Sequence, residues 1–269
     1  GPFVFKVDEW KPGDKAVFVK NPTYKPRRES PSWGAGGKVV KVDRVEWISM
    51  PDHQTAVNAL IAGEIDFIEQ PPHDLLPLLE PESDTIALVN VNPLGNQYMF
   101  RLNHLHPPFN NQKLRRAALA AIQQEDFLKA VIGDPNWYKV CPAMFVCGTP
   151  LATDAGTEIV MKSDFDLAKK LLKEGGYDGT PVVVMQSTDL AVLTNLAPVA
   201  AQALKRAGFN VDLQSMDWQT LVSRRAKKEP PSEGGWNVFL TAWVAADILN
   251  PIMAAGFSAH CDKAWFGWP

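Results

Sequence analysis

The chain has 269 residues, of which 46% are hydrophobic and 21% are charged. This is the composition of a folded globular protein, and it is neither that of a disordered chain nor that of a membrane-spanning one. The formal net charge of −3 and the pI near 6.0 argue against a nucleic-acid partner, because Lys and Arg are scattered rather than gathered in a basic stripe. The first ten residues lack the regions of a signal peptide, so we expect any targeting signal to have been removed.

The first 50 residues are expected to be rich in strands. Phe3–Trp10 and Ala16–Lys20 are strand-like runs on either side of the turn sequence Lys11–Asp14, a pattern that predicts a β-hairpin. A loop rich in Pro, Ser and Gly, residues 21–37, separates this hairpin from a third strand over Val39–Ser49.

A helix and three short elements are predicted next. The helix runs from Asp52 to Ala62 and is closed by Gly63. We expect a short strand over Ile65–Ile68, a short helix from Pro71 to Leu79, and a strand over Thr85–Val91.

The stretch Gly95–Gln123 predicts a strand, a polar corner at Pro107-Pro108 and a helix. In the strand, apolar side chains alternate with a second set that includes Arg101 and Asn103. These two residues lie near the carboxyl end of the strand, where open α/β sheets usually bind ligands. Arg101 stands in an apolar run and needs a partner if it is buried. We therefore expect Arg101 to be ion-paired or to face a ligand.

The second half of the chain predicts an α/β arrangement. A strand over Pro181–Gln186, a helix over Leu190–Ala207 and a strand over Phe209–Gln214 form a strand-helix-strand unit, which joins parallel strands by a right-handed crossover. The other elements expected here are helices over Gln124–Ile132, Asp164–Glu174 and Trp218–Lys228, and a buried strand over Trp236–Trp243.

Motifs of catalysis are not found in the sequence. It contains no nucleophile elbow, zinc-protease motif, phosphate-binding loop or dinucleotide fingerprint, so we expect neither an enzyme nor a cofactor. The spacing of His104 and His106 would place both side chains on one face of a strand, where they could share a metal ion. No third ligand lies nearby in the sequence, so locally hydrogen-bonded histidines are favoured over a metal site.

Two segments that follow strands carry polar groups suited to a ligand. Ser187, Thr188 and Asp189 offer hydroxyls, a carboxylate and free helix N–H groups, although one of them as a simple helix N-cap explains the composition as well. At the end of the last strand, the indole of Trp243 could cover an apolar ligand face and Asp247 could pair with an ammonium group. The alternatives are a core tryptophan and a capping aspartate.

The chain has three cysteines, of which Cys141 and Cys147 bracket a short loop that a disulfide could close. Three free buried thiols are the alternative. An oxidised pair would indicate a protein outside the cytoplasm. Cys261 would then lack a partner, which we expect to lie beyond Pro269.

Several segments, in order along the chain, carry a family resemblance: GPF followed by FKVDEWKPGDKAVFVKNPTY, then KVDRVEW, TAVNALIAGEIDFIE, FRLNHLHPPFNNQKLRRAALAAI, DLAKKLLKEGGY, ALKRAGFNVDLQSMDWQTLVSRR and TAW. In these the chain resembles the family 5 extracellular solute-binding proteins, the dipeptide, oligopeptide and nickel type of ABC importer receptor. The resemblance implies a periplasmic protein with a periplasmic binding protein-like (type II) lobe, a mixed sheet flanked by helices. It also implies closure of two lobes on a solute and delivery to the transmembrane subunits of a permease.

The resemblance further implies that residues 1–269 are the second, C-terminal lobe, truncated at both ends, with residues 1–50 close to the hinge. An isolated lobe of this kind is expected to bind solute weakly or not at all. Dipeptide-type members carry a tryptophan like Trp243, and three residues later an aspartate for the ligand's amino group. Here Ala246 holds that place and Asp247 follows it. Those members also use an arginine for the ligand carboxylate, in the loop matching Gln186 to Asp189, and this arginine is absent here. We expect a short peptide or related polar solute, with Asp247 binding the amine through a one-residue shift.

Two other classes of function remain open on the sequence. A small α/β hydrolase or transferase would need a pocket that joins Asp247, Ser187 and a histidine. A docking module without a ligand would instead expose an apolar patch and lack a cleft.

Overall fold

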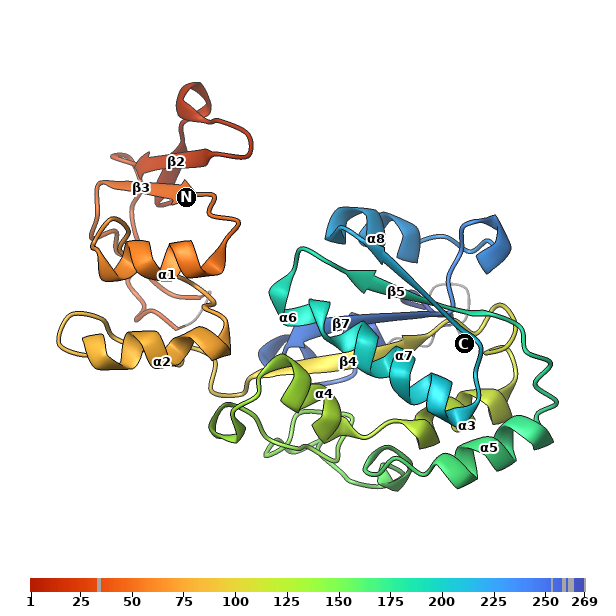
Figure 1. Ribbon diagram of the computed structural model, residues 1–269. Coiled ribbons are helices and arrows are strands. Elements are labelled where there is room, and N and C mark those ends of the chain that lie inside the picture. The colour runs from red at the N-terminus through yellow and green to blue at the C-terminus, as the bar shows by residue number, and fades with distance from the viewer. Residues whose placement is uncertain (33–34, 253, 258–259, 261–263, 269) are drawn as a thin grey trace. The chain divides into compact units, whose positions relative to one another are not determined.

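The computed structural model describes residues 1–32, 35–252, 254–257, 260 and 264–268 (Figure 1). The chain divides into two compact units, Gly1–Pro71 and Pro72–Pro269, and each is described by itself. The assignment of residues 1–269 to one lobe of a larger protein, with residues 1–50 near its hinge, stays a prediction.

The smaller unit is built on a three-stranded antiparallel sheet. Its strands are β1 (Phe3–Phe5), β2 (Lys15–Lys20) and β3 (Arg44–Ile48), in the order β1-β2-β3. The predicted hairpin and third strand are therefore confirmed, although β1 and β3 are shorter than expected. Gly13 has a φ of +77° in the turn before β2, a conformation that glycine adopts without steric cost.

The helix α1 (His53–Ile61) follows the sheet in the smaller unit, and Asp52 caps it by accepting a hydrogen bond from the Thr55 backbone N–H. This satisfies one of the donors that a helix start leaves unpaired, and it confirms the predicted helix. The prediction of a strand over Ile65–Ile68 is wrong. That segment is irregular, and Phe67 is 76% exposed, so it has no packed surface of the kind that favours a strand.

The larger unit begins with short helical turns: η2 (His73–Leu75), α2 (Leu76–Leu79) and η3 (Glu80–Glu82). They correspond to the short helix predicted in this part of the chain. The prediction of a strand over Thr85–Val91 is wrong, because the chain there is irregular and pairs with no described strand. Val89 is 71% exposed, so the apolar side chains of this run are not held on a sheet.

A four-stranded mixed sheet forms the centre of the larger unit (Figure 1). Its strands are β4 (Asn96–Leu102), β5 (Val182–Ser187), β6 (Val211–Met216) and β7 (Val238–Val244), in the order β4-β7-β5-β6. The strands β7, β5 and β6 are parallel, whereas β4 runs antiparallel to β7. The predicted α/β fold with a mixed sheet is thus confirmed.

The helices of the larger unit are α3 (Gln112–Ala121), α4 (Gln124–Val131), α5 (Phe165–Glu174), α6 (Ala191–Thr194), α7 (Leu196–Ala207) and α8 (Trp218–Arg225). They match the predicted helices with two differences. The helix expected over Trp218–Lys228 ends at Arg225. The helix expected over Leu190–Ala207 is interrupted at Asn195, so that α6 and α7 are separate. Gly208, with a φ of 108°, ends α7, as is common where the chain needs a left-handed residue.

The two faces of the sheet have different cores. Along β7, Val238 and Leu240 point to the face that α3, α5 and α7 cover, where the largest cluster of buried side chains lies (Figure 1). The alternate residue Phe239 points to the other face and packs with Trp236 and with Leu221 of α8. This alternation is the two-residue period of a strand that is buried on both faces.

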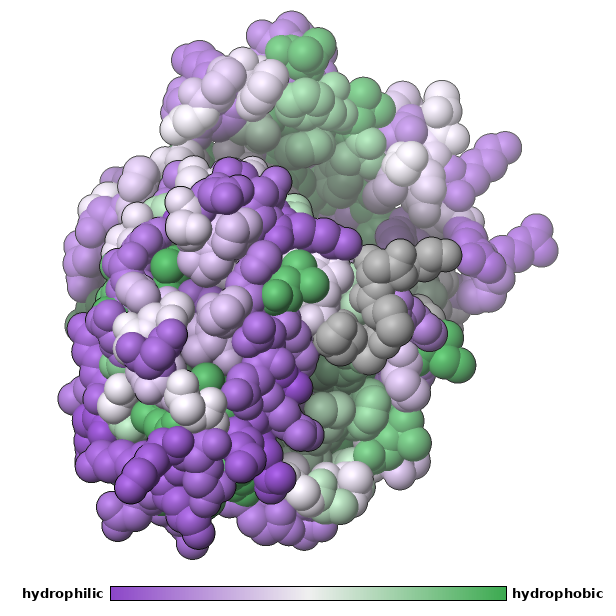
Figure 2. All heavy atoms as spheres, turned by 90° about the vertical axis from the view of Figure 1, so that its right-hand side faces the viewer, coloured by the Kyte–Doolittle hydropathy of each residue, from purple (hydrophilic) through white to green (hydrophobic). Residues whose placement is uncertain are grey.

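Hydrophilic side chains dominate the side of the larger unit nearest the viewer in Figure 2, with hydrophobic ones interspersed. The helix α5 has one face in the core and one in solvent: Ala168 and Leu172 are buried, whereas Lys169 and Lys173 are exposed. No helix in the described part of the chain combines the length and the apolarity that crossing a bilayer requires.

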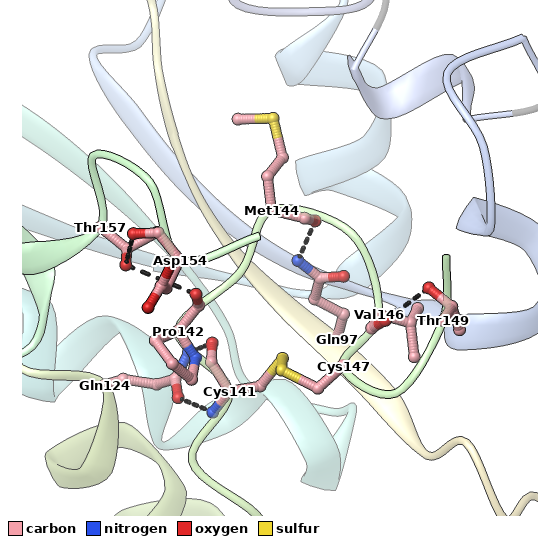
Figure 3. Close-up of a disulfide and its surroundings, with 10 residues drawn as sticks. All are labelled: Gln97, Gln124, Cys141, Pro142, Met144, Val146, Cys147, Thr149, Asp154 and Thr157. Atoms are coloured by element: carbon pink, nitrogen blue, oxygen red, sulfur yellow. Dashed lines mark hydrogen bonds between the residues drawn. A yellow bond between two sulfur atoms is a disulfide. The ribbon is translucent and has the colours of Figure 1, made fainter. Parts of the chain in front are cut away.

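A disulfide joins Cys141 and Cys147 (Figure 3), which confirms the predicted pair. The loop that it closes is fixed at both sides. The Gln124 side-chain amide donates to the Cys141 carbonyl, and the Gln97 side-chain amide donates to the Met144 carbonyl at 2.8 Å. The other predicted feature of the cysteines, an unpaired Cys261, lies outside the described residues.

Removing this disulfide is expected to destabilise the larger unit by about 2 kcal/mol, because the bond closes a short loop and so restricts the unfolded chain only modestly. The double variant Cys141→Ser/Cys147→Ser should therefore lower the urea midpoint of the larger unit, which hydrogen exchange of peptides from β4 and α4 reports separately from the smaller unit. Adding a reductant should shift the midpoint of the unaltered chain but not that of the double variant. Equal midpoints for the oxidised chain and the double variant would contradict this prediction.

Candidate ligand-binding site

The two segments predicted to bind a ligand leave the sheet at the same edge. The strands β5 and β7 are parallel neighbours, and their register pairs Val184 with Val238 and Met185 with Phe239. Continued along the strands, this register sets Ser187, the last residue of β5, level with Thr241, three residues before β7 ends at Val244. The segments 187–189 and 243–247 therefore lie at the same edge of the sheet, and β7 extends further than β5. Ligands of open α/β sheets bind at such an edge.

Asp189 connects the first segment to the helix α8. Its Oδ1 accepts a hydrogen bond from the Ser187 hydroxyl at 3.1 Å and another from the Trp218 backbone N–H at 2.8 Å. Ser187 is only 3% exposed, whereas Thr188 and Asp189 are exposed. The helix after this loop has Leu190 at its N-cap, without a side-chain cap. Asp189 therefore binds the start of α8 and does not cap the helix that follows it in sequence.

The second segment carries a tryptophan near the end of β7 and a carboxylate four residues later. Trp243 is half-buried, and its indole Nε1 has no hydrogen-bond partner among the described residues. The short helix η7 (Ala245–Ile248) follows. Ala246 is half-buried and Asp247 is exposed, and the Asp247 carboxylate makes no hydrogen bond or ion pair with another described residue. It is thus available for a cation from outside the chain.

Trp265 extends the aromatic surface beside Trp243. The two ring centroids are 5.6 Å apart in a T-shaped arrangement, a geometry that the ring quadrupoles favour. Trp265 and Phe266 line an open depression of about 710 Å³, and Ala254 and His260 contribute to the same depression. A smaller depression of about 210 Å³ lies among α4, α5 and α7, on the helical face of the unit, away from the candidate segments.

Arg101 binds backbone carbonyls rather than a carboxylate. Its guanidinium donates to the carbonyl oxygens of Phe266 at 2.6 Å, Gly256 at 2.7 Å and Trp265 at 3.2 Å, and it lies 5.4 Å from the Trp265 ring centroid. Burial lowers the pKa of Arg101. The register of β4 pairs Arg101 with Phe239. Because β7 ends at Val244, the backbone of Arg101 lies five residues from the end of β7 where the ligand segment begins.

Asn103 is fully buried, and its side chain is used by the fold. Its amide nitrogen donates to the Trp236 carbonyl at 3.0 Å, and its Oδ1 accepts from the Leu105 N–H at 3.1 Å. Buried amides are normally satisfied in this way. A solute has no access to this side chain, so Asn103 is not part of the site that we propose.

The two histidines near the Pro-Pro corner have separate surroundings. Burial lowers the pKa of His104 to about 4, with Arg115 and Arg101 adding to the effect, so its ring is neutral at neutral pH. The His106 Nε2 lies 2.7 Å from the Lys228 carbonyl oxygen. Within the described ranges, no group of three or more His, Cys, Asp and Glu side chains is arranged to hold a metal ion.

Three aromatic and basic residues of this region were not singled out in the sequence: Trp218, Arg225 and Trp265. The Arg225 guanidinium lies 5.5 Å from the ring centroids of both Trp218 and Trp265. The sequence does contain a signal for one pair, Trp218 and Arg225, because residues seven apart in a helix lie on the same face. Nothing in the sequence indicates that Trp265 joins them.

An open α/β sheet with a polar loop and an aromatic wall at the carboxyl ends of its strands is characteristic of proteins that bind small molecules. The chain belongs to a family of this class: the model of the bacterial extracellular solute-binding proteins, family 5 middle region, matches residues 1–264.

Relatives and solved structures agree with this assignment. A probable peptide ABC transporter periplasmic-binding protein of Sinorhizobium fredii is 40% identical over 272 residues, which cover 100% of this chain and 51% of the relative. The periplasmic oligopeptide-binding protein OppA of Escherichia coli is 26% identical over 259 residues, which cover 92% of this chain and 43% of the relative. The chain spans about half the length of the curated relatives that it matches.

Two solved structures show the same fold at low sequence identity. The binding protein AgaA from A. tumefaciens R10, in complex with agropinic acid, has a TM-score of 0.75 at 18% identity, covering 98% of this chain and 49% of its own. DppA from Helicobacter pylori, in complex with the peptide STSA, has a TM-score of 0.69 at 20% identity, covering 100% of this chain and 47% of its own. The predicted fold class, an α/β fold of the periplasmic binding protein type with a mixed sheet flanked by helices, is confirmed.

Proposed function

We propose that this chain is part of an extracytoplasmic, periplasmic receptor of an ABC importer, which captures a short peptide or a related polar solute and delivers it to the transmembrane subunits of a permease. The observation that carries this proposal is the exposed Asp247 carboxylate, which has no partner among the described residues and lies four residues after Trp243, at the edge of the sheet where β5 and β7 end. Family membership over residues 1–264 supports the receptor role.

The chemistry of this edge suits a solute that is polar at one end. A carboxylate without a protein partner can form a charge-assisted hydrogen bond with an ammonium group. The half-buried indole of Trp243, four residues earlier, offers an apolar face with a buried N–H. Thr188 and Asp189 add an exposed hydroxyl and a carboxylate at the neighbouring strand end.

Residues 1–269 supply the second lobe in this proposal, and a first lobe supplies the rest of the contacts. The solute stabilises the closed arrangement of the lobes because it binds that arrangement more tightly than the open one. Specificity then depends on side chains of both lobes, and the isolated chain binds solute weakly.

Native mass spectrometry of the full-length protein, purified without refolding, tests this function. We expect a bound species whose mass corresponds to a short peptide or an amino-acid derivative, and its loss after denaturation and refolding. Calorimetry with the recovered compound would then give its affinity. A full-length protein that carries no solute, and that binds none of a library of di- to pentapeptides, would overturn the proposal.

The substitution Asp247→Asn is expected to weaken binding of a solute with a free amine by about tenfold to a hundredfold, the usual contribution of a hydrogen bond to a charged group. The side chain keeps its size, so stability should not change. Calorimetry of the full-length protein measures the effect.

The matched control for this prediction is Asp166→Asn, which removes the same charge from the exposed face of α5. Its affinity should equal that of the unaltered protein. N-acetylation of the solute should remove the difference between the unaltered protein and Asp247→Asn. Equal affinities of the two variants for the free amine would show that Asp247 does not bind it.

A further inference from the structure

The disulfide loop, residues 141–147, lies against η7, the short helix that carries Asp247. Its residue Val146 is buried in a small core whose other members come from β4, from η7 and from the segment after η7. These members are Met99, Ala245, Ile248 and Ala254. Next to Val146, the Phe145 ring packs against the Phe257 ring in a T-shaped arrangement, with centroids 5.2 Å apart. The loop therefore supports the helix that presents the candidate carboxylate.

The same loop holds a side chain of β4. The Gln97 amide nitrogen donates to the Met144 carbonyl at 2.8 Å (Figure 3), and Gln97 is paired with Trp243 in the register of β4 and β7. Directly paired residues of antiparallel strands project their side chains to the same face, with Cβ atoms about 5 Å apart. The loop thus reaches the immediate neighbour of Trp243 as well as the helix that carries Asp247.

The disulfide fixes the course of a segment that lacks regular structure. All of residues 141–147 lie in the described part of the chain, and they form no helix or strand. The Gln124 side chain donates to the Cys141 carbonyl at the start of the loop, and the Thr149 hydroxyl donates to the Val146 carbonyl near its end, at 2.6 Å. An open loop would lose conformational entropy when it packs against η7. The cross-link removes part of that loss in advance, because it leaves the loop fewer conformations.

The position of Asp247 depends on the backbone that carries it. Its carboxylate makes no hydrogen bond or ion pair with another described residue, so no polar contact in that part of the chain fixes it. The helix η7 is a single short turn, Ala245–Ile248, and turns of this kind are marginal without packing. A solute that meets the segment in its binding arrangement for only a fraction of the time binds more weakly in proportion to that fraction. The contacts of the loop with η7 therefore bear directly on solute affinity.

We propose that the disulfide loop is a positioning element of the solute site, which holds η7 and Gln97 so that Asp247 and Trp243 lie where a solute meets them. Val146 and Phe145 make the contacts, and the disulfide keeps these two residues in place. The loop acts through the ligand segment and does not itself bind the solute. This inference rests on the proposed function, because it assigns the support of that site to a separate part of the chain.

The experiment is calorimetry with trialanine on the full-length protein and two loop variants. Val146→Ala removes the contact with η7 and leaves the disulfide intact, and it should weaken binding about threefold to tenfold. Cys141→Ser/Cys147→Ser keeps the apolar side chains of the loop but opens it, and it should weaken binding to a similar extent. An affinity that stays unchanged in either loop variant would overturn the inference.

The matched control is Val182→Ala, which removes the same two methyl groups from a fully buried valine at the first residue of β5, in the core on the helical face of the sheet. This variant should be destabilised at least as much as Val146→Ala, yet its affinity for trialanine should equal that of the unaltered protein. A loop with a purely structural role would make the two valine variants alike, with lower stability and unchanged affinity.

Hydrogen exchange of a peptide covering residues 243–249, measured without any solute, separates this inference from the proposed function. Both loop variants should exchange this peptide about tenfold faster than the unaltered protein. The Val182→Ala control should not, because a short turn exchanges by local opening rather than by global unfolding.

The two measurements together assign each failure. If trialanine does not bind but the exchange accelerates in the loop variants, the peptide-binding function fails while the hold of the loop on the ligand segment stands. If trialanine binds the loop variants as tightly as the unaltered protein and the exchange is unchanged, the function stands and the inference fails. If trialanine does not bind and the exchange is unchanged, both fail.

Discussion

Replacing Asn237 with alanine is expected to lower the free energy of unfolding of the larger unit by about 2–4 kcal/mol, because it leaves one buried backbone N–H and one partly buried carbonyl without their partners. Asn237 is fully buried, directly before β7. Its Oδ1 accepts from the Val183 N–H at 2.9 Å, and its amide nitrogen donates to the Pro107 carbonyl at 3.0 Å. One side chain therefore joins three segments of the chain that are distant in sequence.

The measurement must report on the larger unit alone, because a chain with two compact units need not unfold in one step. Hydrogen exchange of peptides from β5 and β7, followed by mass spectrometry, meets this requirement. The matched control is Asn210→Ala, since the Asn210 amide donates to the Gly179 carbonyl at 3.1 Å on the exposed surface. It should cost less than about 1 kcal/mol. A loss for Asn237→Ala as small as that of the control would contradict the prediction.

The fold could be predicted where local pattern and tertiary packing agree. The strand-helix-strand unit from β5 to β6 was clear from its apolar runs and from Gly208, and the start of α3 was marked by Asn111, whose side chain accepts from the Lys113 N–H. The failed strands, Ile65–Ile68 and Thr85–Val91, have strand-like composition as well. A strand needs a partner, and no partner is visible in a single sequence.

The candidate site was predictable only in part, for the same reason. Sequence reasoning found Trp243 and Asp247 because they end a buried strand. For Arg101 it predicted that the side chain needs partners if it is buried. The partners are backbone carbonyls more than 150 residues away in the chain, which no local pattern indicates. Trp265 and Arg225 come together through the same long-range packing, so no local spacing indicates them.

The second large effect is expected for Arg101→Met, which should destabilise the larger unit by about 2–4 kcal/mol, because it breaks three partly buried hydrogen bonds of a charged group. Methionine fills much of the same space but leaves the carbonyls of Gly256, Trp265 and Phe266 without their donor. Hydrogen exchange of peptides from β4 and β7 gives this loss. In an Arg101→Lys variant one ammonium group can reach only some of these oxygens, so the loss should be intermediate.

The Arg101→Met substitution should also change the ligand site, which the loss of a purely structural side chain would not do. Because Arg101 holds Trp265 by its carbonyl and its ring, the contact between Trp265 and Trp243 should loosen, and the near-ultraviolet circular dichroism of the folded protein should weaken. Arg115→Met is the matched control, since Arg115 donates to one carbonyl, that of Phe109 at 2.8 Å. It should cost about 1.5–3 kcal/mol and leave the dichroism unchanged. An unchanged spectrum for Arg101→Met would mean that the rings of Trp243 and Trp265 keep their arrangement without the guanidinium, and that Arg101 stabilises the fold without shaping the ligand site.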